Sequence, residues 1–123
     1  MKKVLVVEDN EKNMYLISFI LEKMGHLVLQ ADSGERGIEL AAREQPDLIL
    51  MDIQLPGIDG LETTKRIRRS GNVPIIAITS FAMTGDRERL LSAGCNGYIE
   101  KPINPETIMG EISAYLEKPG DKQ

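Results

Sequence analysis

Three carboxylates, a hydroxyl and an amine lie at the ends of short, mostly apolar segments in this 123-residue chain. The five residues are Glu8, Asp9, Asp52, Thr79 and Lys101. If the apolar runs are neighbouring parallel strands, their carboxyl ends meet at one edge of a sheet, and the polar side chains meet there too. Each residue type is common at a strand end, so the interpretation rests on the whole set.

A cluster of carboxylates predicts a site for a divalent cation. Three carboxylates roughly 5 Å apart repel one another by a few kcal/mol per pair at an effective dielectric constant of about 20. Such a cluster therefore raises a pKa or binds a cation. Oxygen ligands without a nearby His or Cys suit Mg²⁺, which takes one or two carboxylates and keeps several waters. The amine of Lys101 instead suits an anion or a phosphoryl oxygen.

An acidic half for a metal ion and a cationic half for an anion together match the requirements of phosphoryl transfer. A carboxylate can act as the nucleophile of such a reaction and form an acyl phosphate. Asp52 is the best candidate for the nucleophile, because it ends the central apolar run and is expected to lie between the other groups. Glu8 and Asp9 are better placed to hold the metal ion.

Five segments, three of which are continuous apolar runs, are predicted to form the strands that position these side chains. Residues 4–7, 48–51 and 75–78 are continuously apolar rather than alternating, which is typical of parallel strands covered by helices on both faces. The predicted strands are residues 3–7, 27–31, 47–52, 73–79 and 97–100.

Helical patterns fill the segments after each strand. An apolar stripe predicts the first helix over residues 11–24. Ser33 is a good N-cap for the second helix, which must end before Pro46. The third helix is predicted over about 61–69 after a turn at Asp59-Gly60, the fourth over about 84–94, and the fifth from Asn104-Pro105.

Five alternating strand–helix units predict an open, doubly wound α/β domain. This alternation gives a parallel sheet with right-handed crossovers, and five units are too few for an eight-stranded barrel. We expect one domain over residues 1–118 and a disordered tail over 119–123.

Composition narrows the setting in which the protein acts. The formal net charge of −4 argues against direct nucleic-acid binding. The apolar runs are shorter than the roughly 20 residues of a membrane span, and the first residues do not resemble a signal peptide. We therefore expect a cytoplasmic protein that contacts no membrane. Cys95 is expected to be a packing residue, and the basic residues 65–69 to end the third helix.

Four motifs in order resemble those of the receiver domains of two-component response regulators. They are VVEDN at residues 6–10, LMDIQLPGIDG at 50–60, IAITS at 76–80 and GYIEKP at 97–102. Each motif alone is weak, but four at compatible spacing are specific, and the resemblance covers residues 2–116. It implies a flavodoxin-like sheet of strand order 2-1-3-4-5, in a receiver of the single-domain type.

The resemblance implies that Asp52 accepts a phosphoryl group from a phosphohistidine of a sensor histidine kinase or a phosphotransfer protein. It also implies that Mg²⁺ is held by Glu8, Asp9, Asp52 and the backbone carbonyl of Gln54. The domain would assist its own phosphorylation and dephosphorylation rather than act as an enzyme on other molecules. Glu8 stands where many members of the family have Asp, and its longer side chain could reach the metal through water.

The same resemblance assigns the switching roles. Thr79 would bond a phosphoryl oxygen, Lys101 would pair with the phosphoryl charge, and Tyr98 would turn inward as Thr79 moves. The surface made by the fourth helix, fifth strand and fifth helix would then bind a downstream protein. The Lys101–Pro102 bond is expected to be cis. Ser80 replaces a common Ala and stays small enough for a phosphodonor to approach.

Three other functions fit the sequence less well. A flavin or nucleotide binder would need a phosphate loop after the first strand, where Glu8 and Asp9 would repel phosphate. A phosphatase with an Asp nucleophile would need a second Asp two residues later, where this chain has Gln54. An interaction module that had lost phosphorylation would not need the full set of acceptor, metal ligands and lysine.

No output domain is predicted after the fifth helix. A stand-alone receiver and a domain cut from a larger protein both fit this sequence. In either case the state of Asp52 would be sensed by contact with another chain or with a domain outside this sequence. Candidate partner contacts are Met83, Arg87, Glu88 and Arg89.

Overall fold

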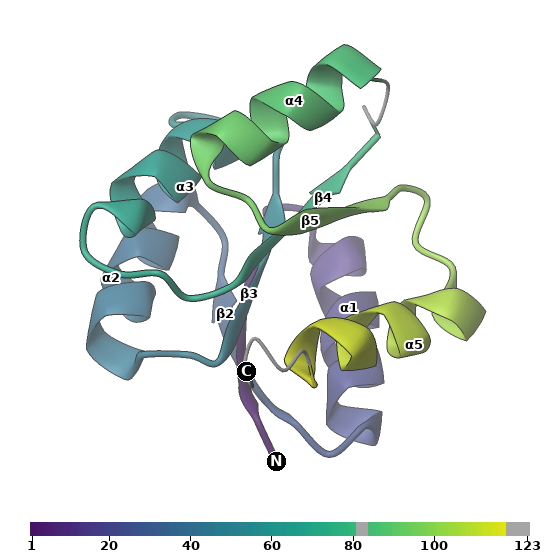
Figure 1. Ribbon diagram of the computed structural model, residues 1–123. Coiled ribbons are helices and arrows are strands. Elements are labelled where there is room, and N and C mark those ends of the chain that lie inside the picture. The colour runs from purple at the N-terminus through teal and green to yellow at the C-terminus, as the bar shows by residue number, and fades with distance from the viewer. Residues whose placement is uncertain (81–83, 118–123) are drawn as a thin grey trace.

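A five-stranded parallel sheet of order β2-β1-β3-β4-β5 forms the centre of the protein (Figure 1). The computed structural model describes residues 1–80 and 84–117. The strands are β1 (Lys3–Val7), β2 (Leu27–Ala31), β3 (Leu48–Asp52), β4 (Ile75–Thr79) and β5 (Gly97–Glu100). The helices are α1 (Glu11–Lys23), α2 (Gly34–Glu44), α3 (Gly60–Arg68), α4 (Thr84–Ala93) and α5 (Pro105–Leu116). The predicted doubly wound fold and its strand order are confirmed.

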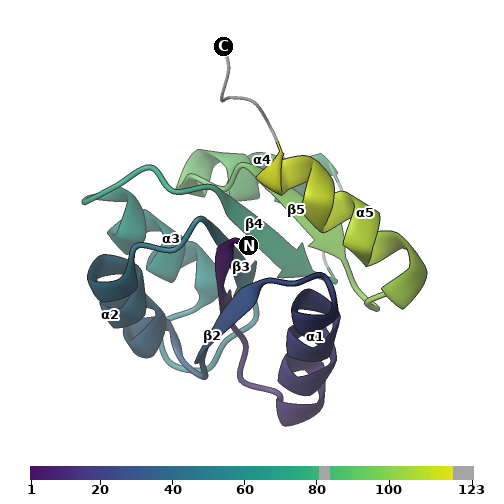
Figure 2. The same ribbon diagram turned by 90° about the horizontal axis from the view of Figure 1, so that it is seen from below.

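Helices cover both faces of the sheet, as the view from below shows (Figure 2). Helices α1 and α5 lie on one face, where Ile17 and Ile112 join a buried cluster with the strands. Helices α2, α3 and α4 lie on the other face, where Leu40, Ile67 and Leu90 join a second cluster. The three central strands are therefore enclosed from both sides, which explains their continuously apolar sequences.

Two strands begin slightly later than predicted. β3 starts at Leu48 rather than Asp47, whose carboxylate accepts a hydrogen bond from the Lys3 backbone N–H at 2.8 Å. β4 starts at Ile75 rather than Val73, because Pro74 has no N–H to donate to the sheet. The predicted tail over residues 119–123 and the candidate contact Met83 lie outside the described residues.

Four helices begin at a residue whose side chain caps the first turn. The capping residues are Asn10 for α1, Ser33 for α2, Asp59 for α3 and Asn104 for α5. A side-chain oxygen at this position satisfies a backbone N–H that has no partner within the helix. The sequence pattern predicted only a turn at Asp59-Gly60. Instead Asp59 accepts from the Glu62 N–H at 2.9 Å, and α3 begins at Gly60.

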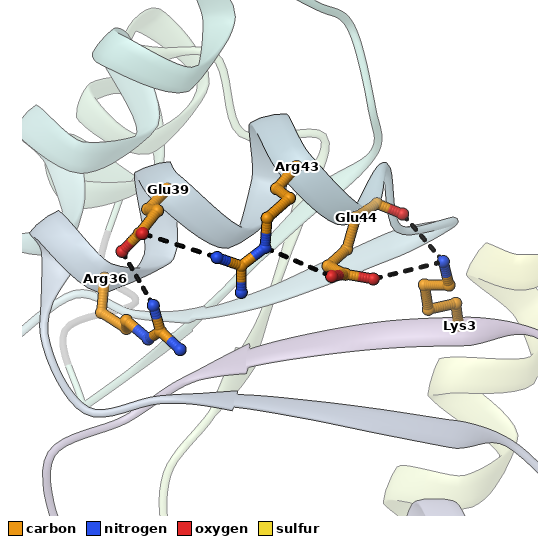
Figure 3. Close-up of polar contacts among 5 residues, drawn as sticks. All are labelled: Lys3, Arg36, Glu39, Arg43 and Glu44. Carbon is orange, nitrogen blue, oxygen red and sulfur yellow. Dashed lines mark hydrogen bonds and ion pairs between the residues drawn. The ribbon is translucent and has the colours of Figure 1, made fainter.

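A chain of ion pairs runs along the exposed face of α2 and ends on β1 (Figure 3). Arg36 pairs with Glu39 at 2.8 Å, and Arg43 lies 3.6 Å from Glu39 and 3.3 Å from Glu44. Lys3 Nζ donates to the Glu44 carbonyl at 2.9 Å. Each exposed pair contributes little to stability. The Lys3 contact, however, satisfies a carbonyl at the C-terminal end of α2 and joins that helix to β1.

Helix α5 packs so closely on β5 that Gly97 has no room for a side chain. A Cβ at this position would collide with the hydroxyl and ring of Tyr115 on α5. We expect Gly97→Ala to lower the free energy of unfolding by about 1–3 kcal/mol, because Tyr115 or the end of α5 must shift to make room. Urea denaturation of the variant and the wild-type protein measures the difference.

Gly110→Ala, in the helix α5 that carries Tyr115, provides the matched control. Nothing lies within 4 Å of a Cβ added at Gly110. We expect this variant to match the wild type or to gain up to about 1 kcal/mol, because Ala favours a helix over Gly. A Gly97→Ala protein as stable as the wild type would contradict the close packing of Tyr115 against β5.

Candidate functional site

The carboxyl ends of β1, β3, β4 and β5 bring the predicted side chains to one edge of the sheet. Parallel pairing aligns Val7 with Met51, so Glu8 and Asp52 come directly after a matched pair of residues on neighbouring strands. Thr79 ends β4 and pairs with Glu100 of β5, so Lys101 comes directly after that pair. The strand register therefore gathers residues from four separate parts of the chain.

Three carboxylates of this edge form a tight cluster. One oxygen each from Glu8, Asp9 and Asp52 can be chosen so that all three lie within 4.8 Å of one another. Glu8 and Asp52 are each only 2% exposed, whereas Asp9 is exposed to solvent. Two carboxylates are thus shielded from water beside one another, and the third lies at the surface.

Asp52 is held in place by donors on its other side. Its Oδ1 accepts from the Lys101 ammonium group at 3.2 Å and from the Gln54 backbone N–H at 3.0 Å. Lys101 is itself positioned by its backbone, since its N–H donates to the Thr79 carbonyl at 2.8 Å. The carboxylate of Asp52 therefore lies between an acidic pair and a cation.

The pKa of Glu8 is raised from its ordinary value of 4.5 to about 7. Burial is the largest cause, because it disfavours the charged form of the carboxyl group, and a hydrogen bond with Asp52 and that residue's negative charge act in the same direction. The Asn10 backbone N–H, which donates to Glu8 Oε2 at 3.1 Å, and the charge of Lys101 oppose the shift. Near neutral pH a proton or a cation can neutralise this carboxylate.

The acidic cluster fits a hard divalent cation. Glu8 Oε1 is buried and has no hydrogen-bond partner among the described residues. A buried acceptor left without a donor is costly, and a metal ion would satisfy it. The cluster offers only carboxylate oxygens, with no His or Cys in it, which is the ligand chemistry of Mg²⁺ or Ca²⁺.

Gly60 is a positioning residue that the sequence pattern did not indicate. A Cβ on Gly60 would collide with the Asp52 carbonyl oxygen and the Ile53 backbone, and the Gly60 N–H donates to the Ile53 carbonyl at 3.0 Å. The start of α3 therefore lies directly against the end of β3 and closes the loop after Asp52. Only Gly permits this approach, but a Gly after an N-capping Asp carries no sequence signal for such a contact.

Thr79 and Tyr98 lie on β4 and β5, whereas Gln54 follows β3. Thr79 is fully buried. Tyr98 is half-buried and packs against the cluster under α2, α3 and α4. The Lys101–Pro102 bond is cis, as expected. Gln54 is exposed and contributes its N–H to Asp52, and metal binding by its carbonyl stays a prediction. The roles of all these residues stay predictions in the same way.

The raised pKa of Glu8 predicts a specific pH dependence of stability. Between pH 4.5 and about 7, the folded protein holds a proton on Glu8 that the unfolded chain has released. The stabilisation is therefore complete below pH 4.5 and is lost as the pH rises through about 7. We expect the wild type to lose about 2–3 kcal/mol relative to Glu8→Gln, which cannot ionise, across that interval.

Urea denaturation of both proteins at several pH values in the presence of EDTA measures this difference. Comparing the two proteins removes the contribution of His26 and other groups that titrate in the same interval. Parallel pH profiles for the wild type and Glu8→Gln would show that Glu8 does not titrate in this way.

Comparisons with known proteins agree with the geometry of this edge. The family model for the response regulator receiver domain matches residues 4–113. The polar-differentiation response regulator DivK of Brucella ovis is 45% identical over 118 residues, which are 94% of this chain and 96% of that protein. No helix in the described parts of the chain is long and apolar enough to cross a membrane.

Solved structures of receiver domains have the same fold. One is the receiver domain of sensor histidine kinase PA1611 from Pseudomonas aeruginosa, which was solved with magnesium in its active site cleft. It is 36% identical with a TM-score of 0.87, and the match covers 95% of this chain and 98% of the PA1611 chain. The BeF3-activated receiver domain of Klebsiella pneumoniae RstA is 33% identical, with a TM-score of 0.87. The match covers 94% of this chain and 99% of the RstA chain. The family match, the DivK-like sequence and the shared fold show that the chain belongs to the response regulator receiver domains of two-component signalling.

Proposed function

We propose that Asp52 accepts a phosphoryl group from a phosphohistidine of a sensor histidine kinase or a phosphotransfer protein. One observation carries the proposal. The Asp52 carboxylate lies within 4.8 Å of ligand oxygens of Glu8 and Asp9 and 3.2 Å from the Lys101 ammonium group. A metal-binding half and an anion-binding half therefore flank a single buried nucleophile, as phosphoryl transfer requires.

In this reaction an oxygen of Asp52 attacks the phosphorus atom. A new P–O bond forms, the P–N bond of the phosphohistidine breaks, and the imidazole leaves with the electron pair of that bond and takes up a proton. The donors on Asp52 Oδ1 fix the orientation of the carboxylate before the attack. Lys101 and the Thr79 hydroxyl then stabilise the oxygens of the phosphoryl group. Hydrolysis of the resulting acyl phosphate resets the protein.

Mg²⁺ is the cofactor we assign to the acidic cluster. Glu8, Asp9, Asp52 and the Gln54 carbonyl would hold it, and the magnesium in the PA1611 receiver domain supports the choice of metal. When bound, it neutralises negative charge on the phosphoryl oxygens. Glu8 is suited to this position because burial has already made its uncompensated charge unfavourable.

The readout of phosphorylation is proposed to be a protein contact on the surface of α4, β5 and α5. Thr79 and Tyr98 lie on the side of the sheet that α4 covers. A shift of Thr79 toward the phosphoryl group would reposition Tyr98 and α4. Arg87, Glu88 and Arg89 are exposed there for a downstream partner. The negative net charge argues against nucleic acid as that partner, and a cytoplasmic location stays a prediction.

Phosphorylation of Asp52 can be tested by intact-mass measurement. We expect the protein incubated with Mg²⁺ and acetyl phosphate to gain one phosphoryl group, because the site activates its own carboxylate toward small phosphodonors. The gain should be absent without Mg²⁺ and absent in Asp52→Ala.

Asp47→Asn is the matched control, because Asp47 immediately precedes the first residue of β3, at the opposite end of that strand from Asp52, and takes no part in the site. This variant should be phosphorylated like the wild type. A protein that gains no mass, or an Asp52→Ala variant that gains as much as the wild type, would exclude Asp52 as the acceptor.

The metal assignment predicts weaker Mg²⁺ binding by Asp9→Ala. We expect its affinity for Mg²⁺ to fall about tenfold or more, because the variant removes an oxygen ligand at the exposed side of the cluster. Isothermal titration calorimetry measures the affinity. Asp32→Ala removes an exposed acid that lines the same surface pocket as Glu8 and Asp9 but lies outside the three-carboxylate cluster. This variant should bind Mg²⁺ nearly as well as the wild type. Equal affinities for all three proteins would remove Asp9 from the metal site.

A further inference from the structure

Arg87 of α4 contacts Tyr98 of β5 in two ways. Its Nη2 donates a hydrogen bond to the Tyr98 hydroxyl at 2.9 Å. Its guanidinium carbon also lies 5.4 Å from the centroid of the Tyr98 ring, within cation–π distance. The hydrogen bond holds the hydroxyl end of the Tyr98 side chain and the cation–π contact lies over its ring, so Arg87 acts on the aromatic group at two points, in addition to the packing of Tyr98 against the apolar cluster.

Tyr98 lies on the same face of the sheet as Thr79, on the neighbouring strand. Tyr98 pairs in register with Ala77, two residues before Thr79 on β4. Because alternate residues of a strand share a face, Thr79 and Tyr98 project from the same face of neighbouring strands, under α4. The Tyr98 hydroxyl meets Arg87 at the exposed end of this face, whereas Thr79 is fully buried. A tyrosine ring that turned toward Thr79 would have to leave Arg87.

Within the part of α4 whose side chains are described, few others attach the helix to the sheet. Among the residues of α4 whose burial is described, 85–93, only Leu90 and Ala93 are buried. The other residues of that stretch are exposed or half-buried, and Arg89 pairs with Asp86 of its own helix. The Arg87–Tyr98 contact is therefore a substantial part of what joins this helix to β5, in an element with little buried surface to resist movement.

We propose that Arg87 is a positioning residue that holds Tyr98 and α4 in the arrangement of the unphosphorylated protein. By stabilising that arrangement, Arg87 sets how readily the site takes a phosphoryl group on Asp52. The inference rests on the proposed function and adds a residue to it. A contact made in only one of two states shifts the population toward that state, and it reduces the apparent affinity of any ligand that needs the other state.

The test uses Mg²⁺ with beryllofluoride, a non-covalent mimic of the phosphoryl group. We expect Arg87→Met to bind beryllofluoride about three- to tenfold more tightly than the wild type, because one cation–π contact and one exposed hydrogen bond no longer oppose the switch. Fluorine NMR titration at saturating Mg²⁺ measures this affinity. The affinity for Mg²⁺ alone, measured by calorimetry, should be unchanged, because Arg87 does not touch the acidic cluster.

A double-mutant cycle separates positioning from a general effect of removing charge. Tyr98→Phe removes the hydrogen-bond acceptor and keeps the ring. In the Tyr98→Phe background, Arg87→Met should tighten beryllofluoride binding less than it does in the wild type, because part of the contact is already gone. Arg66→Met, which removes an exposed arginine of α3 paired with Glu62 at 2.9 Å, should bind beryllofluoride as the wild type does.

The outcomes distinguish this inference from the function on which it rests. A wild-type protein that does not bind beryllofluoride in the presence of Mg²⁺ overturns the proposed function. A wild type that binds, together with an Arg87→Met variant of equal or weaker affinity, overturns the role of Arg87 alone. An equal gain in affinity for Arg66→Met also overturns it, because the effect would then arise from net charge and not from the contact with Tyr98.

Discussion

The burial of two neighbouring carboxylates at the ends of β1 and β3 is the constraint on which the rest of the site depends. Glu8 and Asp52 are nearly inaccessible to water, so their charges are poorly solvated and repel each other. Asp52 is compensated by Lys101 and the Gln54 N–H. Glu8 is compensated only in part, by the Asn10 N–H, and its raised pKa results from that deficit. The site is thus suited to a metal ion because the protein compensates the negative charge of Glu8 only in part.

The sheet tolerates this unfavourable arrangement because its central strands are otherwise apolar, apart from Lys3 at the start of β1 and Thr79 at the end of β4. β3 and β4 are buried along their full length, and β1 from Val4 onward. Strained or poorly solvated groups persist in a protein only where the surrounding structure holds them. On the Asp52 side of the site, Gly60 lets the start of α3 pack directly against the end of β3. Where α4 meets β5, the described part of the helix contributes fewer buried side chains, which suits the movement of α4 that we propose.

The elements, and the gathering of carboxylates and Lys101 at one edge of the sheet, could be predicted because both follow from patterns along the sequence. Continuous apolar runs marked the buried strands, and polar residues directly after them marked the carboxyl edge. The contacts that depend on tertiary distance were not predictable. Nothing in the local sequence shows that Gly60 touches the Asp52 backbone or that Arg87 reaches Tyr98. The N-cap role of Asp59 was missed because Asp-Gly is also a common turn, and only the path of the chain after Gly60 distinguishes a cap from a turn.

Lys101 has two attachments of different kinds. Its main chain is tied to β4 through the Thr79 carbonyl, and its ammonium group reaches Asp52 across the site. With the backbone anchored, the length of the side chain limits how far the Lys101 ammonium group can extend from the β4–β5 edge toward Asp52. A group added to Asp52 within that reach would meet a cation that already contacts the carboxylate. A bulkier group would require the Lys101 side chain to change its conformation.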